Sequence, residues 1–298
     1  MITIVSEEKL KATQASSQAA TKCAFIGGSG RSGTSILAHI FANHPDVLYF
    51  AEPRFLIDRG GVSDLVQGRI PLNEFLLNMM NTFNQKLQAS LKISRIEHPE
   101  EIYSSNVMQS LIRESFNGTG NINGSLNKFL NRLFQHGVEA CNKKYWLEKT
   151  PHTVTIVDVL HTIFSEMKYI HIIREPKDVA CSMFRKNWGP NNSSEFVPYY
   201  HQIMNAAMKA KNQVQQENYC VVSLENLMIR PREIMRYLFD FAQFPTSDDQ
   251  INTWTMNLDP EKAHIDRWKK ELDPKSIQLI EDGCVDNYEY WKSEEMQI

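Results

Sequence analysis

The 298-residue sequence lacks the features that mark several large classes of protein. Its five cysteines are odd in number and include no Cys-x-x-Cys pair, which argues against a disulfide framework and against a zinc site. Cys23 and Cys220 lie in apolar runs, so we expect buried thiols and a reducing, cytoplasmic compartment. No apolar segment has the length of a signal peptide or a membrane span, so no membrane partner is expected.

The sequence also has no excess of positive charge, and its formal net charge is −3. A dedicated nucleic-acid-binding protein usually has a basic face, so we expect no nucleic-acid partner. Hydrophobic residues make up 42% of the chain, which is enough for a sizeable core. The length fits one large domain or two small ones.

A glycine-rich segment, Phe25-Ile-Gly-Gly-Ser-Gly-Arg-Ser-Gly-Thr-Ser-Ile-Leu37, follows the first apolar run. Its spacing is that of a phosphate-binding loop, but Thr34 stands where such loops carry lysine, and the cation is Arg31 instead. Unpaired N–H groups at the start of the following helix bind anions. The segment therefore predicts a site for a phosphate-like group, and the missing lysine argues against the terminal phosphates of ATP.

Short apolar runs alternate with helical patterns along most of the chain. The expected strands are residues 23–26, 47–50, 145–147, 169–173 and 219–223. The expected helices between and after them are residues 34–42, 153–164, 177–186, 197–216 and 231–241. Several strands are continuously apolar, as in sheets covered on both faces. The pattern predicts an α/β, P-loop-like three-layer fold with a central parallel sheet and helices on both faces.

Residues 60–140 break this alternation with helical patterns only. They predict a helical insertion that serves as a lid or acceptor-binding part of a single domain spanning residues 22–298. Residues 1–21 are expected to be a flexible N-terminal tail. Near the end, residues 264–272 predict a basic helix or loop, and residues 277–280 a short helix.

A second motif begins at the fourth expected strand, Tyr169-Ile-His-Ile-Ile-Arg-Glu-Pro-Lys-Asp-Val-Ala-Cys-Ser. The strand ends at Arg174, and Pro176 opens a helix, where proline is tolerated. Ser182 lies eight residues after Arg174, so a guanidinium fork and a hydroxyl are placed to bind a second phosphate. Lys186, four residues further, is expected on the same helix face.

The two motifs together resemble the sulfotransferases that use 3′-phosphoadenosine-5′-phosphosulfate (PAPS). The loop resembles their 5′-phosphosulfate site, and the residues that match it are Gly30, Arg31, Ser32, Gly33, Thr34 and Ser35. Arg174 and Ser182, with Lys186 as an added charge, resemble their 3′-phosphate site. The resemblance covers residues 22–60 and 145–245.

Arginine in place of the loop lysine resembles the Golgi-type and bacterial branch, which includes tyrosylprotein sulfotransferases. Phe-Ala-Glu52-Pro-Arg54 is similar to the segment that carries the catalytic glutamate and a nearby arginine of that branch. Lys149, in Leu-Glu-Lys-Thr-Pro, resembles its transition-state lysine. The sequence has no Golgi-type membrane anchor, which favours a soluble enzyme with a small-molecule acceptor.

The resemblance implies in-line transfer of a sulfuryl group from PAPS to a hydroxyl, or an amine, of the acceptor. The product nucleotide is then adenosine 3′,5′-bisphosphate (PAP). Glu52 is the implied base, Arg31 and Lys149 stabilise the leaving group, and Arg54 steers the base or the sulfate. No metal is expected, because fixed cations take the place that Mg²⁺ fills in kinases.

Two alternatives remain open from the sequence. A P-loop kinase or NTPase needs lysine at position 34 and an acidic residue at a strand end for Mg²⁺, where this chain has Arg174. A non-catalytic nucleotide-binding scaffold has no such requirement. His152 is expected to be a cap or acceptor contact, and His171 a core residue with its hydrogen bonds satisfied. The basic run 267–270 is either solvated or reaches the nucleotide, and no motif specifies the acceptor or the oligomeric state.

Overall fold

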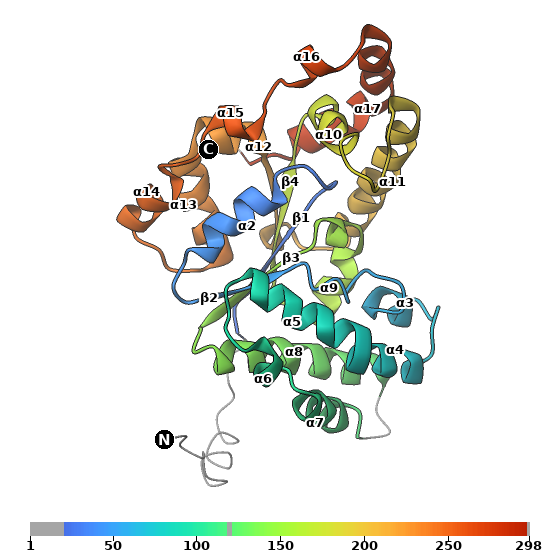
Figure 1. The fold of residues 1–298 in the computed structure, drawn as a ribbon, viewed down its shortest axis with the longest axis vertical. Helices are drawn as coiled ribbons and strands as arrows, with labels where there is room; N and C mark the ends of the chain where they lie inside the picture. Colours follow the sequence, from blue (N-terminus) through green and yellow to red (C-terminus); the bar gives the residue numbers. More distant parts are fainter. Residues whose placement is uncertain (1–20, 118–120, 297–298) are drawn as a thin grey trace.

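A five-stranded parallel sheet lies at the centre of the protein (Figure 1). The computed structural model describes residues 21–117 and 121–296, so nearly all of the predicted tail lies outside the described residues. The strand order is β2-β3-β1-β4-β5, and every pair of neighbours is parallel. The strands are β1 (Cys23–Gly27), β2 (Val47–Ala51), β3 (Tyr145–Lys149), β4 (Lys168–Ile173) and β5 (Tyr219–Ser223). All five predicted strands are confirmed.

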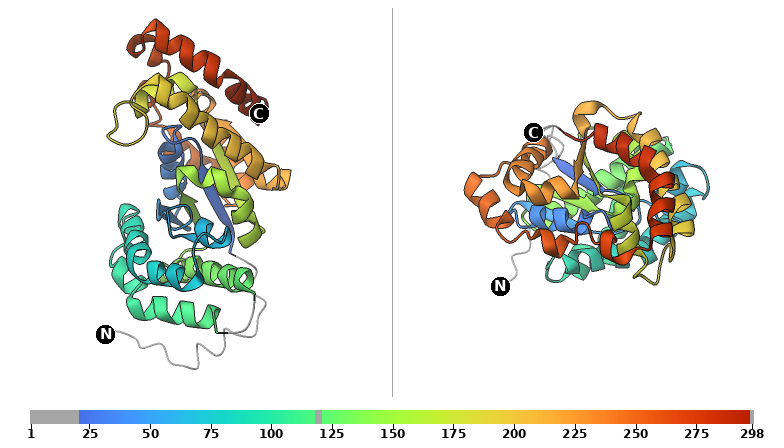
Figure 2. Two further views of the ribbon diagram at one scale, coloured as in Figure 1. Left: turned by 90° about the vertical axis from the view of Figure 1, so that its right-hand side faces the viewer. Right: turned by 90° about the horizontal axis from the view of Figure 1, so that it is seen from above.

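Helices cover both faces of the sheet because successive strand residues point to opposite sides. Ala24 and Ile26 pack with side chains of α2 (Thr34–Ala42) and α13 (Pro231–Ala242). Phe25, between them, belongs to a second core with α8 (Ile122–Ala140), α9 (Val157–Ile163) and α11 (Ser193–Lys211). The predicted α/β three-layer fold is therefore confirmed, and the two views of Figure 2 show the sheet enclosed by helices.

The segment between β2 and β3 is helical. It contains α3 (Val62–Val66), α4 (Leu72–Asn78), the π-helical turn η1 (Met79–Phe83), α5 (Asn84–Ile93), α6 (Pro99–Ile102), α7 (Ser105–Ser115) and α8. Figure 1 shows these helices gathered at one end of the molecule, away from α13 and α14 (Asp248–Thr255). Apolar side chains of α4, α5, α7 and α8 join the core that contains Phe25. The insertion is thus anchored on the sheet rather than separate from it.

Four helix predictions need correction. The helix expected at 197–216 is α11, which begins at Ser193, after the Asn192 cap, and ends at Lys211. The helix expected at 153–164 begins as a 3₁₀ turn, η2 (Pro151–Ile156), in which the Thr153 hydroxyl donates to the Thr150 carbonyl at 2.8 Å. The helix expected at 177–186 is α10 (Pro176–Met183), so Lys186 lies in the following loop and not on the helix face of Ser182. The short helix expected at 277–280 is the long helix α17 (Pro274–Ser293).

The start of α17 has a local cause. The Asp273 carboxylate accepts the N–H groups of Lys275 and Ser276, each at 3.0 Å, and Pro274 fits the first helical position. Its buried positions are Ile280, Cys284, Asn287 and Trp291, which recur at helical spacing. The rest of the C-terminal region contains α12 (Leu224–Ile229), α15 (Pro260–Ala263) and α16 (Trp268–Glu271).

The cysteines and the helices show two further properties. Cys23 and Cys220 are buried, as predicted. Across residues 21–117 and 121–296, no helix combines the length and the apolar character that crossing a bilayer requires.

Glu148 is a buried carboxylic acid in the middle of the sheet. It stands on β3 between Phe25 of β1 and Phe50 of β2, and its side chain has no exposure to solvent. One carboxyl oxygen accepts a hydrogen bond from the Thr150 hydroxyl, whereas the other has no partner among the described residues. Burial raises the pKa of Glu148 from 4.5 to about 8.

This shift predicts that stability falls as pH rises from about 5 to about 8. In that window the unfolded chain has released the Glu148 proton and the folded protein still holds it, so the slope reaches about 1.4 kcal/mol per pH unit. Glu148→Gln should remove this contribution and flatten the profile. Urea unfolding of both proteins at pH 5, 6.5 and 8 measures the difference, and equal slopes would show that Glu148 ionises normally.

Candidate functional site

A cavity of about 740 Å³ lies at the carboxyl ends of the strands. In open parallel sheets, ligands bind at this edge where the strand order reverses, and here β1 has β3 on one side and β4 on the other. Its lining combines the glycine loop, the segments after β2, β3 and β4, and a late segment. The two sequence motifs therefore form one site.

The cavity concentrates positive charge in a chain whose net charge is negative. Its only acidic lining residue among those described is Glu52. The lysines and arginines that line it are Arg31, Arg54, Arg174, Arg185, Lys186, Lys262 and Arg267. Such a basic hollow attracts and holds polyanions.

The glycine loop turns sharply between β1 and α2. Gly30 and Gly33 have φ of 76° and 101°, and Arg31 between them has φ of 59°, which is unusual for a residue with a side chain. A Cβ at Gly33 would lie 2.8 Å from Leu224 Cδ1, so space as well as backbone angle requires glycine there. Among the described residues no side chain caps the start of α2, so its first N–H groups are available to an anion.

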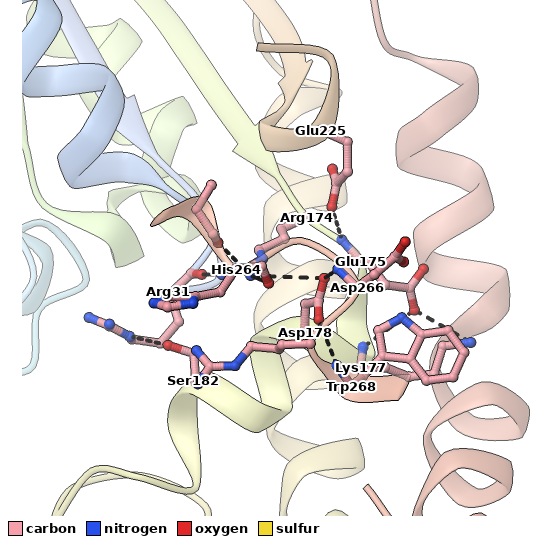
Figure 3. A network of polar contacts seen from close by, with 12 residues as sticks. Arg31, Arg174, Glu175, Lys177, Asp178, Ser182, Glu225, His264, Asp266 and Trp268 are labelled. Carbon is pink, nitrogen blue, oxygen red and sulfur yellow. Dashed lines mark hydrogen bonds and ion pairs between the residues drawn. The ribbon is translucent and has the colours of Figure 1, made fainter. Parts of the chain in front are cut away.

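The loop also contacts the Arg174 motif directly (Figure 3). Arg31 Nε donates to Ser182 Oγ at 3.0 Å, and Arg174 Nη1 donates to the Arg31 carbonyl at 3.3 Å. The Arg31 side chain, expected at the phosphosulfate, thus lies against the residue expected to bind the 3′-phosphate. Thr34 and Ser35 line the cavity with Gly30 and Gly33, whereas the Ser32 side chain is buried in the wall.

Arg174 also holds a segment that the sequence analysis left undecided. We call residues 260–268 the strap. Arg174 Nη2 donates to the carbonyls of Ala263 and His264 at 3.0 and 2.8 Å. A guanidinium has two edges that bind an anion through a pair of N–H groups, one formed by Nε and Nη2 and the other by Nη1 and Nη2. Because the strap uses both hydrogens of Nη2, it occupies part of each edge of Arg174. With both Nη2 hydrogens used, a phosphate that bound Arg174 would contact single N–H groups, or it would displace the carbonyl of Ala263 or His264.

Asp178 fixes the other end of the strap. Its carboxylate, which is almost fully buried, accepts the backbone N–H groups of Asp266 and Trp268 at 2.8 and 3.1 Å. Lys177 Nζ lies 4.3 Å from the centre of the Trp268 ring, a cation–π distance. These contacts bring Lys262, His264 and Arg267 to the cavity. The basic run at 267–270 therefore reaches the site through Arg267.

Three of the four predicted catalytic residues, Glu52, Lys149 and Arg54, meet at the ends of two neighbouring strands, whereas the Arg31 side chain lies against Ser182. Lys149, the last residue of β3, donates through Nζ to Ser35 Oγ at 3.2 Å and pairs with the Glu52 carboxylate. The Lys149 side chain is 4% exposed and that of Glu52 is 37% exposed. A buried ammonium thus links the glycine loop to a solvent-accessible carboxylate.

Strained backbone sets the direction of Glu52 and Arg54. Their φ angles are 54° and 65°, both in the left-handed region. Arg54 Nη1 lies 3.9 Å from Glu52 Oε2, and Arg54 Nε and Nη2 each contact the Asp58 carboxylate. Arg54 therefore lies beside the carboxylate without a hydrogen bond to it.

The two histidines differ in their surroundings. His152 lines the cavity, and its Nε2 is 2.9 Å from the hydroxyl of Tyr199, a residue that no sequence motif singles out. Burial, together with the charge of Arg54, lowers the pKa of His152, so its ring is neutral near pH 7. His171 is a core residue as predicted, with Nδ1 2.9 Å from the Tyr219 hydroxyl. Its Nε2 has no partner in the described part of the chain, which corrects the expectation of full satisfaction.

Comparisons with known proteins give the family of this chain. A family model described as the sulfotransferase family matches residues 24–248, well over half of the chain. The nodulation protein NoeE of Sinorhizobium fredii is 25% identical over 174 residues, which is 58% of this chain and 33% of NoeE. The chain thus spans about one third of the length of that curated relative.

Solved structures share the fold at low sequence identity. The sulfotransferase domain from the curacin biosynthetic pathway has 16% identity and a TM-score of 0.52, covering 89% of this chain and 98% of that domain. Sulfotransferase STF9 from Mycobacterium avium has 12% identity and a TM-score of 0.51, covering 98% of this chain and 81% of STF9. With the family match over residues 24–248, we conclude that this chain belongs to the sulfotransferase family.

Proposed function

We propose that this protein transfers the sulfuryl group of PAPS to a hydroxyl, or an amine, of a small-molecule acceptor. The observation that carries the proposal is the direct contact between the glycine loop and α10, where Arg31 Nε donates to Ser182 Oγ at 3.0 Å. One nucleotide that carries an anion at each end of its ribose fits a single basic cavity built from both motifs.

In the proposed reaction, the bond between sulfur and the bridging oxygen of the phosphosulfate breaks as the acceptor oxygen bonds to sulfur. Glu52 takes the acceptor proton, and the electrons of the broken bond stay on the nucleotide, which leaves as PAP. Lys149, next to Ser35, is placed to stabilise the charge that develops on the bridging oxygen. The free N–H groups at the start of α2 hold the adjacent phosphate.

The 3′-phosphate is assigned to the other end of the cavity. Ser182 and Lys186 come from α10 and its following loop, and Arg267 comes from the strap. In this proposal Arg174 contributes mainly by joining the loop to the strap, through three hydrogen bonds to backbone carbonyls. These groups bind and orient the nucleotide, and the reacting atoms are at Glu52 and Lys149.

His152 is a second candidate for the base. It lines the cavity, and a neutral imidazole is able to accept a proton. Glu52 is preferred because it lies beside Lys149 and Ser35, at the proposed sulfuryl position, whereas His152 Nε2 is already engaged by Tyr199.

The nucleotide kinase alternative is not favoured, since Thr34 occupies the lysine position and the family match is to sulfotransferases. Sulfuryl transfer by the purified protein would distinguish the proposed enzyme from a scaffold that only binds the nucleotide.

Binding of PAP is the first expected outcome. Excess PAP at 100 times its dissociation constant should stabilise the protein by about 2.7 kcal/mol, because only the folded chain has the cavity. A thermal unfolding scan with and without EDTA measures the shift, which should be the same in both buffers. If PAP produced no shift, or only an EDTA-sensitive one, the proposed nucleotide site would be wrong.

Loss of the base is the second expected outcome. Glu52→Gln keeps the size of the side chain but cannot accept the proton, so kcat for sulfuryl transfer should fall by about 10²–10⁴-fold. His152→Gln serves as the matched comparison and should cost much less. The measurement is transfer of ³⁵S-sulfate from labelled PAPS to a panel of phenols and alcohols. Undiminished activity of Glu52→Gln with a large loss in His152→Gln would move the base to His152.

A further inference from the structure

Arg54 is held in place by a carboxylate that the proposed reaction does not use. Asp58 accepts from Arg54 Nε at 3.0 Å and from Nη2 at 2.8 Å, which occupies one fork of the guanidinium. The Asp58 side chain is 18% exposed. Although burial opposes it, hydrogen bonds from Arg54 and Lys86 hold the pKa of Asp58 below its ordinary value. Asp58 is therefore charged and fixes the plane of the Arg54 guanidinium.

Lys86 connects this pair to the helical insertion. It stands on α5, and its Nζ lies 2.5 Å from Asp58 Oδ2. The backbone supports the same arrangement, because the N–H of Asp58 donates to the Arg54 carbonyl at 2.9 Å. Two cations thus share one carboxylate, which leaves a net positive charge at the Arg54 end of the group.

The contacts form an ordered row that leads away from the nucleotide loop. Ser35 contacts Lys149, Lys149 pairs with Glu52 through Oε1, and Arg54 faces the other oxygen, Oε2. Asp58 and Lys86 follow on the side of the insertion. Lys149 and Arg54 therefore face different oxygens of the proposed base, so an acceptor whose proton Glu52 takes has the Arg54 guanidinium within its reach.

The second fork of Arg54 remains available. Its Nη1 makes no hydrogen bond to the residues that the structure describes, and the nearby Glu52 oxygen, at 3.9 Å, is beyond hydrogen-bond distance. The Arg54 side chain is 42% exposed and lines the cavity. A planar fork with one edge fixed by Asp58 and the other edge open matches a planar oxyanion.

We infer that Arg54 forms an acceptor subsite for an oxyanion such as a carboxylate, carried close to the hydroxyl or amine that receives the sulfuryl group. Asp58, supported by Lys86, is a positioning residue for this subsite. The inference rests on the proposed function and adds the substrate class, since it predicts an anionic acceptor rather than a neutral one. A neutral acceptor gains nothing from a preorganised guanidinium, and Asp58 would then have no role in selectivity.

Matched acceptors test the subsite. Each pair consists of a hydroxylated carboxylic acid and its primary amide, such as 4-hydroxyphenylacetate and 4-hydroxyphenylacetamide, or a short-chain 3-hydroxy acid and its amide. The wild-type protein should prefer the acid of at least one pair by about tenfold or more in kcat/KM, as expected for a charge-assisted fork. Arg54→Lys keeps the charge and removes the fork, so this ratio should fall toward one. The exposed Arg59, which does not line the cavity, provides the control Arg59→Lys, with an unchanged ratio.

Asp58→Asn supplies the test of positioning. It should lower the ratio of acid to amide in the same direction, mainly through a higher KM for the acid, whereas a purely structural role would change both acceptors equally. Calorimetric titration of each pair onto PAP-bound protein gives a readout that does not need turnover. Equal use and equal binding of acid and amide by the wild type, or a ratio that Arg54→Lys leaves unchanged, overturns the subsite. Failure to bind PAP overturns the proposed function instead, so the two failures are distinguishable.

Discussion

Parallel pairing of the strands is the constraint on which the rest of the site depends. Because β1 pairs in parallel with both β3 and β4, and β3 with β2, four strands end at one edge of the sheet. The residues that follow them, from the glycine loop to Glu52 and Arg174, must then meet in one place. Hydrogen bonds of the sheet backbone therefore determine which side chains form the cavity, and the side chains determine what it binds.

This dependence explains why much of the fold was predictable. The strands are short apolar runs buried on both faces, and such runs are visible in a single sequence. Gly33 and Pro176 mark the starts of helices by their backbone properties alone. The catalytic candidate Glu52 follows β2 and the candidate Lys149 ends β3, so the strand prediction also brought them near each other.

The parts that sequence reasoning missed are those made by long-range contacts. Nothing local to Asp178 indicates that its carboxylate accepts the N–H groups of Asp266 and Trp268, nearly ninety residues away. Tyr199 meets His152 only because α11 packs on η2. Lys186 was expected on the helix of Ser182 for a different reason. The helical sequence pattern continues to residue 186, but α10 ends at Met183. The signal for α17 was present, in the cap at Asp273 and in the spacing from Ile280 to Trp291.

The strap, which completes the cavity, comes late in the sequence. All five strands, the glycine loop and the Arg174 motif are complete by residue 223, but one wall of the cavity comes from residues 262–267. During synthesis, N-terminal segments leave the ribosome first. A nascent chain that has already formed its sheet still lacks the backbone carbonyls that Arg174 binds. Under the proposed function, the contacts that the strap makes to the nucleotide therefore form only after residues 262–267 have been synthesised, so the nucleotide stabilises the completed chain more than any shorter nascent one.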